Sequence, residues 1–171
     1  CAFLSVCSSP HGFSYFVHNA PAQSTASSGT GLWEAAARNC INKKALTGVN
    51  GAFASRFSDV VGLNGKDMEV LSVPWGQPIL PEQVVERLST GEFDAVTVVH
   101  NETSTGATSP IKEISQAIRA MPGGEDIMIL VDSVSGLSGA RNEMDAWVLD
   151  VVLSSNQKAF ARPPLYLLHI W

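Results

Sequence analysis

The sequence has few of the features that mark nucleic-acid-binding or membrane proteins. Charged residues make up 16% of its 171 residues, and acidic residues outnumber basic ones, which gives a formal net charge of −5. Nucleic acid is not expected as a partner, because proteins that bind it carry a basic stripe. No apolar run reaches the ~18 residues that a membrane span requires, so no membrane partner is expected either.

Cysteine is scarce as well. Cys1, Cys7 and Cys40 are odd in number and lack the spacing of a disulfide framework. This argues for a reducing compartment, and we expect a cytoplasmic protein. The short apolar run near the start has no basic region before it, so the sequence predicts no targeting signal.

Several common catalytic and nucleotide-binding motifs are missing. The sequence has no G-x-S-x-G nucleophile elbow and no Walker loop. The glycine turn SSGTG does not complete the G-x-G-x-x-G pattern, which leaves a dinucleotide-binding Rossmann domain as the weakest alternative. His100 and Glu102 lie close together, but no second His or Cys cluster follows at ligand spacing, so we expect no metal site.

What the sequence does contain is an alternation of helix-like and strand-like segments. Strands are expected at residues 67–73, 95–100, 127–132, 147–154 and 166–170, and helices at 32–42, 50–65, 81–88 and 110–121. Strands that are apolar on both faces and are separated by helices predict a three-layer α/β domain, in which helices cover a mostly parallel sheet.

The periodicity does not extend over the whole chain. Residues 1–27 show neither helical nor strand periodicity and are predicted to form an irregular segment. Residues 28–171 are predicted to form a partial domain. Because this domain would stop directly after an apolar strand, we expect further sequence beyond it.

Two charged residues follow apolar strands. Asp132 ends IMILVD, and Lys158 follows the strand expected at 147–154. The carboxyl ends of neighbouring parallel strands face one crevice, so this acid and this amine are expected to meet there. A desolvated neutral amine can form a Schiff base, and a buried carboxylate can pair with a protonated pyridine nitrogen. Alternatively, Lys158 is a solvated lysine and Asp132 a turn or cap residue.

Weaker signals accompany this pair. Thr30, Gly31 and Leu32 stand where the glycine turn becomes a helix, a position whose backbone amides can accept a phosphate. A tight turn before any helix would look the same. Phe53 follows a turn and could stack on a ring, although a core role fits it as well. Thr103 follows the strand at 95–100 and could bond a ring hydroxyl.

Five motifs, taken together, resemble the class V aminotransferases of fold type I. In chain order they are SGTGLWEAA, NGAF, HNETSTG, VDSVSGLSG and SSNQKAFARPP. The resemblance is to the branch of alanine–glyoxylate and serine–glyoxylate aminotransferases. It implies the large domain of a pyridoxal-phosphate-dependent enzyme that moves an amino group from alanine or serine to a 2-oxo acid such as glyoxylate. It also implies a homodimer, and it leaves the C-terminal small domain outside the chain.

The resemblance also implies roles for individual residues. Lys158 would form the Schiff base with the cofactor and later move the α-proton, while Asp132 would pair with the pyridine nitrogen. Phe53 would stack on the ring, and Val134 would pack on its opposite face. Contacts with the phosphate region are implied for Thr30, Gly31, Leu32 and Gln157, and a contact near the ring hydroxyl for Thr103.

The chain departs from this family at several points. Asn156 stands where the family has a small residue, and Leu165 where it usually has glycine. NKKALTGVNG is shorter than the strand that usually precedes the NGAF turn, so we expect a damaged strand. The substrate-carboxylate arginine of the family lies in the absent domain, and Arg162 does not replace it. Another class V enzyme, such as a cysteine desulfurase or a lyase, and a catalytically inert truncated fragment therefore stay open as alternatives.

Overall fold

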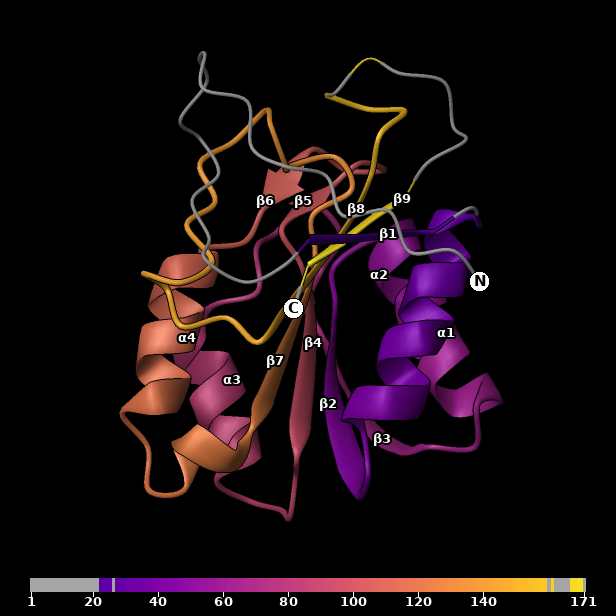
Figure 1. Cartoon of the computed structure of the whole chain (residues 1–171). Coiled ribbons are helices and arrows are strands. Elements are labelled where there is room, and N and C mark those ends of the chain that lie inside the picture. The colour runs from indigo at the N-terminus through magenta and orange to yellow at the C-terminus, as the bar shows by residue number, and fades with distance from the viewer. Residues whose placement is uncertain (1–21, 26, 160, 162–166, 171) are drawn as a thin grey trace.

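A seven-stranded sheet forms the centre of the molecule, with the strand order β1-β9-β8-β7-β4-β2-β3 (Figure 1). The computed structural model describes residues 22–25, 27–159, 161 and 167–170. Strands β8, β7, β4, β2 and β3 run parallel, whereas β9 is antiparallel to both of its neighbours. The strands are β1 (Ala22–Thr25), β2 (Lys44–Val49), β3 (Asp67–Ser72), β4 (Ala95–Val99), β7 (Met128–Asp132), β8 (Val151–Ser155) and β9 (Leu167–Ile170).

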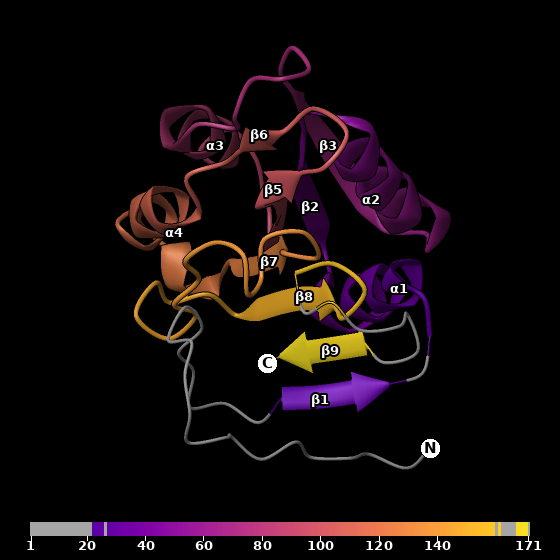
Figure 2. The same ribbon diagram turned by 90° about the horizontal axis from the view of Figure 1, so that it is seen from above.

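Helices cover both faces of this sheet. Helices α1 and α2 lie on one face, and α3 and α4 lie on the other (Figures 1 and 2). A two-stranded hairpin of β5 and β6 follows β4. The predicted three-layer, mostly parallel α/β architecture is confirmed, and its strand order differs from the 3-2-1-4-5-6 order of a Rossmann domain. The bounds are α1 (Gly29–Cys40), α2 (Ala52–Leu63), α3 (Pro81–Leu88), α4 (Ile111–Arg119), the 3-10 helix η1 (Gly124–Asp126), β5 (Asn101–Glu102) and β6 (Ala107–Thr108).

The two faces of the sheet build separate apolar cores. Successive side chains of a strand point to opposite faces, so in β7 Ile129 and Val131 join the core under α3 and α4, whereas Leu130 joins the core under α1 and α2. In the second core Trp33 of α1 stacks on Phe57 of α2, with ring centroids 5.3 Å apart. This layering explains why the central strands are apolar throughout.

Strand β2 is intact, so the expectation of a damaged strand before the NGAF turn is wrong. The strand pairs with β3 along its whole length, from Lys44 to Val49, and with β4 on its other side. Its start is held by Asp94, whose carboxylate accepts the backbone amides of residues 42–44 at 2.7–3.0 Å. The amine of Lys44 reaches Glu69 of β3 at 3.1 Å, so a polar residue at the strand end does not interrupt the ladder.

Strand β8 begins later than predicted, at Val151 instead of residue 147. The side chain of Arg119 donates hydrogen bonds to the Val148 carbonyl at 3.1 Å and to the Asp150 carboxylate at 2.5 Å. The Ser115 hydroxyl donates to the carbonyl of Trp147. Side chains of helix α4 therefore form hydrogen bonds with the carbonyl groups that a longer strand would use in the sheet.

Residues 22–25 correct the prediction of an irregular segment over residues 1–27. They form β1, which among the described strands pairs with β9 alone and lies at the edge of the sheet. This short strand has little apolar content and a partner far away in sequence, so a local periodicity search misses it. Residues 1–21 and 26 lie outside the described part of the chain.

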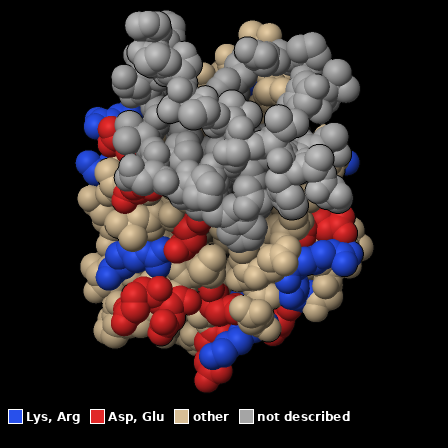
Figure 3. Space-filling view, in the orientation of Figure 1, with Lys and Arg blue, Asp and Glu red and all other residues tan. Residues whose placement is uncertain are grey.

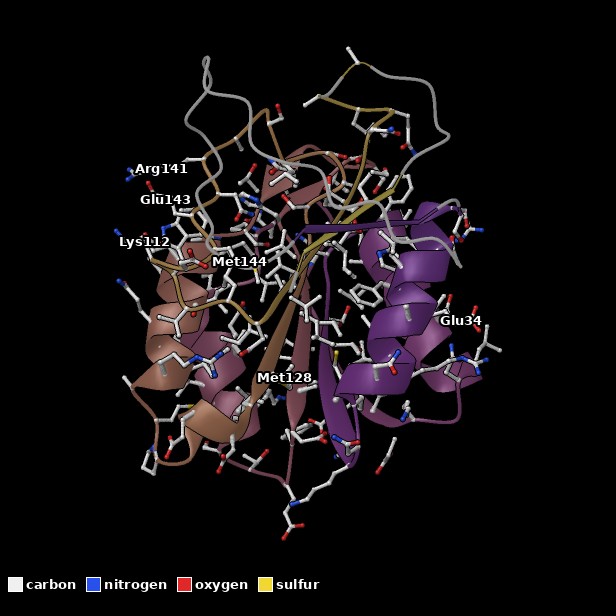
Figure 4. All side chains as sticks on the ribbon, viewed as in Figure 1. Glu34, Lys112, Met128, Arg141, Glu143 and Met144 are labelled. Carbon is white, nitrogen blue, oxygen red and sulfur yellow. The ribbon has the colours of Figure 1, made fainter. Side chains whose placement is uncertain are left out.

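The described surface mixes charges of both signs. On the face that Figure 3 shows, basic and acidic side chains are interspersed. Two exposed ion pairs, Glu34 with Arg38 at 2.7 Å and Arg141 with Glu143 at 2.8 Å, lie on opposite sides of the molecule (Figure 4). Within the described residues, no helix has the length and apolar character needed to cross a membrane.

The hydrogen bonds from Arg119 of α4 to the segment before β8 predict unequal effects for two arginine substitutions. Arg119→Met should lower the free energy of unfolding by about 2–3 kcal/mol, because it removes the Arg119 hydrogen bonds to the Asp150 carboxylate and to the backbone carbonyls of Gly124, Ile127 and Val148. Arg38→Met removes a solvent-exposed pair and should change it by less than about 0.5 kcal/mol. Urea unfolding of both variants tests this, and equal losses would contradict it.

Candidate active site

The carboxyl ends of β4, β7 and β8 meet at one edge of the sheet, which Figure 2 views from above. The parallel register places Val99 opposite Asp132, and Asp132 opposite Leu153. A cavity of about 230 Å³ opens at this edge. Most of the predicted site residues line it, namely Thr30, Phe53, Thr103, Asp132, Val134, Gln157 and Lys158.

Two predicted residues do not line the cavity. The backbone amide of Gly31 donates to the Ser28 carbonyl at 2.8 Å, and the Leu32 side chain is buried in the core under α1 and α2. The helix starts at Gly29 instead of after the glycine turn, which moves the exposed first turn towards the N-terminus. Gly29 and Thr30 are therefore the residues of this turn that face the cavity.

The N-terminus of α1 is an open anion-binding position. Its N-cap residue Ser28 makes no side-chain capping hydrogen bond, and the first turn holds no acidic residue. Unpaired amides and the helix dipole both favour a negative charge at such an end. The position can therefore accept an anion such as a phosphate.

The N-terminus of α2 is already neutralised by a buried carboxylate. Glu102 accepts the backbone amides of Phe53 at 3.4 Å and Ala54 at 2.9 Å, and the hydroxyl of Ser104 at 2.7 Å. Gly51 is needed beside it, because a Cβ atom there would lie 2.3 Å from the Glu102 side chain. This contact fixes the first turn of α2, which presents Phe53 to the cavity.

Asp132 is the central charged group of the site and is only 3% exposed. Its Oδ2 atom accepts the indole N–H of Trp33 at 3.1 Å, and its Oδ1 atom accepts the backbone amide of Val134 at 2.8 Å. Burial raises the pKa of Asp132 to about 6; the nearby Glu102 adds to the rise, and the two hydrogen bonds oppose it. A cationic ligand group beside Asp132 would favour the carboxylate form.

His100 is buried at the end of β4 beside Asp132. Its backbone amide donates to the Asp132 carbonyl at 2.8 Å, and its Nδ1 atom lies 3.2 Å from the Ser133 hydroxyl. Burial lowers the pKa of His100 to about 4, so its ring is neutral near pH 7. His100 and Glu102 thus have separate partners, and the described residues hold no cluster of three potential metal ligands.

Two cationic side chains line the cavity. Lys158 follows β8, and Arg56 lies on α2 one turn after Phe53. Both are exposed, and neither forms an ion pair with another described residue. The cavity therefore combines one buried acid with two cations and an open helix end.

Sequence reasoning missed several lining residues, among them Trp33, Arg56, Asn101 and Ser155. Helical spacing could have found the first two, because Trp33 lies three residues after Thr30 and Arg56 three residues after Phe53.

Two polar atoms of these residues have no partner. Ser155 Oγ and Asn101 Oδ1 are buried and make no hydrogen bond within the structure. Buried polar atoms normally have a hydrogen-bond partner, so these two mark the cavity as a polar binding site.

Comparison with known protein families identifies the family of this chain. The model of the family described as aminotransferase class-V matches residues 47–164. The chain belongs to the class V aminotransferases. Among curated class V and related enzymes, it is 39% identical over 140 residues to an uncharacterized aminotransferase of Methanocaldococcus jannaschii, covering 80% of this chain and 35% of that protein. It is 36% identical over 141 residues to serine–glyoxylate aminotransferase of Methylorubrum extorquens, again covering 80% of this chain and 35% of that protein.

A solved aminotransferase structure supports the fold. The alanine–glyoxylate aminotransferase from Nostoc sp. superposes with a TM-score of 0.80 and 30% identity, over 87% of this chain and 39% of that one. The predicted fold type I architecture and the predicted family are thereby confirmed. This chain spans little more than a third of the relatives it matches.

The buried acid predicts a characteristic pH dependence. Between its ordinary value of 3.8 and its folded value of about 6, Asp132 holds a proton in the folded chain more strongly than in the unfolded chain. Its contribution to the free energy of unfolding therefore falls by about 3 kcal/mol as pH rises through this window. The effect of His100 is opposite, because its folded pKa of about 4 lies below 6.5 and stability falls as pH falls.

A comparison with Asp132→Asn separates the two effects, since His100 contributes equally to both proteins. The free energy of unfolding of the variant, relative to the unaltered chain, should rise by about 2 kcal/mol between roughly pH 4.5 and pH 7. Urea unfolding across this range measures the difference, and a constant difference would refute the buried titration.

Proposed function

We propose that this cavity binds pyridoxal phosphate and that the longer protein transfers an amino group from alanine or serine to a 2-oxo acid such as glyoxylate. The observation that carries the proposal is the gathering of Asp132, Lys158 and the open N-terminus of α1 around one cavity. The serine–glyoxylate and alanine–glyoxylate activities named for the relatives supply the substrate class.

The residues present fit the three reactive parts of this cofactor. Its phosphate matches the first turn of α1, where Thr30 lines the cavity together with Gln157. Its ring nitrogen matches Asp132, a buried carboxylate that a cation would stabilise. Its aldehyde matches the amine of Lys158. The unpartnered hydroxyl of Ser155 offers a further hydrogen bond to a polar ligand.

Each of these residues then has a physical task. When bound, pyridoxal phosphate supplies an electron sink for the electrons released at the α-carbon of an amino acid. Asp132 holds the ring nitrogen in its protonated form, and Lys158 carries the proton to and from the α-carbon. Phe53, held at the first turn of α2 by Glu102, covers the ring. Val134, whose amide is bonded to Asp132, orders the loop after β7.

The remaining expectations concern the longer protein. We expect it to form a homodimer in the cytoplasm and to bind the substrate carboxylate through an arginine outside this chain. A cysteine desulfurase or lyase activity would appear as product formation from cysteine or another amino acid without a 2-oxo acceptor. Amino transfer to glyoxylate by the longer protein supports the proposal, and its absence with a bound cofactor favours these alternatives.

The attachment site is testable on this chain. After incubation with pyridoxal phosphate and reduction with borohydride, peptide mapping should place the label on Lys158, and Lys158→Ala should lose it. Lys112→Ala is the matched control, because this exposed lysine lies on α4 away from the cavity (Figure 4) and its loss should leave the label unchanged. Label spread over surface lysines would favour the inert-fragment alternative.

Two neighbouring serines give a matched pair for the binding site. Both are fully buried, but the Ser154 hydroxyl donates to the Ser133 carbonyl at 3.2 Å, whereas the Ser155 hydroxyl has no hydrogen-bond partner among the described residues. Ser155→Ala should raise the free energy of unfolding by about 1 kcal/mol and weaken cofactor affinity about tenfold. Ser154→Ala should instead lower the free energy of unfolding by about 1 kcal/mol and leave cofactor affinity unchanged. Urea unfolding and absorbance titration measure both, and parallel effects of the two variants would count against the site.

A further inference from the structure

The indole of Trp33 is the one side-chain donor that the described structure gives to Asp132. Its Nε1–H donates to Asp132 Oδ2 at 3.1 Å across 99 residues of sequence. The other carboxylate oxygen is bonded to the amide of Val134, which belongs to the same loop. Trp33 is therefore the contact that ties the carboxylate at the end of β7 to helix α1.

The position of this indole is set independently of Asp132. Its ring stacks on Phe57 of α2 with an interplanar angle of 14° and is 4% exposed. Leu130 and Leu153, from the strands beneath, belong to the same core. Because this packing fixes the ring plane, the direction of the N–H is fixed before any ligand binds. Such a preorganised donor needs no rearrangement to act.

The surroundings of Asp132 make this donor important. Glu102 of β5 adds negative charge nearby, and His100 at the end of β4 is buried with a neutral ring. Lys158 and Arg56 lie on the cavity wall but form no ion pair with Asp132. If the indole N–H were lost, one oxygen of a buried acid would lack a donor, and the protonated form would gain.

We propose that Trp33 is a positioning residue that fixes the orientation of the Asp132 carboxylate and keeps it ionised for a cationic ring nitrogen. This inference rests on the proposed cofactor site, which Trp33 serves without touching the reacting atoms. It gives a functional reason for a tryptophan in α1, the helix whose N-terminus would bind the phosphate of the proposed cofactor.

Trp33→Phe isolates the hydrogen bond, because phenylalanine can still stack on Phe57 but has no N–H. In the unloaded chain with 13C-labelled aspartate, the Asp132 titration midpoint should move up by about one pH unit, a tenfold change in proton affinity. The matched control is Trp147→Phe, since this buried indole contacts the ring of His100 instead of a carboxylate and should leave the midpoint unchanged. An unmoved midpoint in Trp33→Phe, or an equal shift in both variants, overturns the inference.

A second measurement does not depend on whether a Trp33 variant folds. In the unaltered chain, the Nε1–H resonance of Trp33 should titrate with the same midpoint as Asp132, and in Asp132→Asn this titration should disappear. An indole resonance that ignores the ionisation of Asp132 overturns the inference.

Measuring the affinity for pyridoxal phosphate distinguishes a failure of this inference from a failure of the proposed function. Trp33→Phe should bind pyridoxal phosphate close to tenfold more weakly near pH 5, which lies below both midpoints, and only about twofold more weakly near pH 7, with the borohydride label still on Lys158. Unchanged affinity overturns the role of Trp33, whereas failure of the unaltered chain to bind pyridoxal phosphate overturns the proposed function. In that case the two titrations still decide whether Trp33 controls Asp132.

Discussion

The parallel pairing of β4, β7 and β8 is the constraint on which the site depends. Parallel strands deliver their carboxyl ends to one edge, so residues that are distant in sequence, from His100 to Lys158, meet without any long loop having to find its place. Register matters as much as direction. Because strand side chains alternate, a slip of one residue in β7 would exchange Leu130 and Ile129 between the two cores and turn Asp132 away from Trp33.

The two helices on one face of the sheet, α1 and α2, differ in what neutralises the positive end of the helix dipole. The N-terminus of α2 is satisfied from within by Glu102, whereas the N-terminus of α1 has neither an acidic residue nor a capping side chain. Two helix dipoles therefore reach the same edge, but only one is available to an anionic ligand. In the proposed site, this asymmetry would place the anionic end of a ligand at α1 and its cationic end at Asp132.

The sequence allowed the fold class to be predicted, and it brought Asp132 and Lys158 to one cavity, because apolar strands ending in Asp132 and leading to Lys158 are local patterns. It did not reveal β2, whose start depends on Asp94, a residue about fifty positions away. It also extended β8 too far, since the competing bonds from Arg119 come from another helix. Gly31 and Leu32 do not line the cavity because α1 starts earlier than predicted, and the contact of Trp33 with Asp132 was not foreseen because it spans 99 residues. Apart from the start of α1, each failure concerns an interaction between segments that are separated in sequence.

The order of strands also bears on how the chain is made. Strand β1 is joined to the sheet only through β9, which lies between it and β8. During synthesis the other five strands and all four α-helices emerge before residue 167 does, so they can assemble while β1 has no neighbour to pair with. Strand β1, which precedes the first turn of α1, is therefore anchored only after β9 has emerged. A ribosome that stalls before β9 would release a chain with an open sheet edge at β8, which is a template for aggregation.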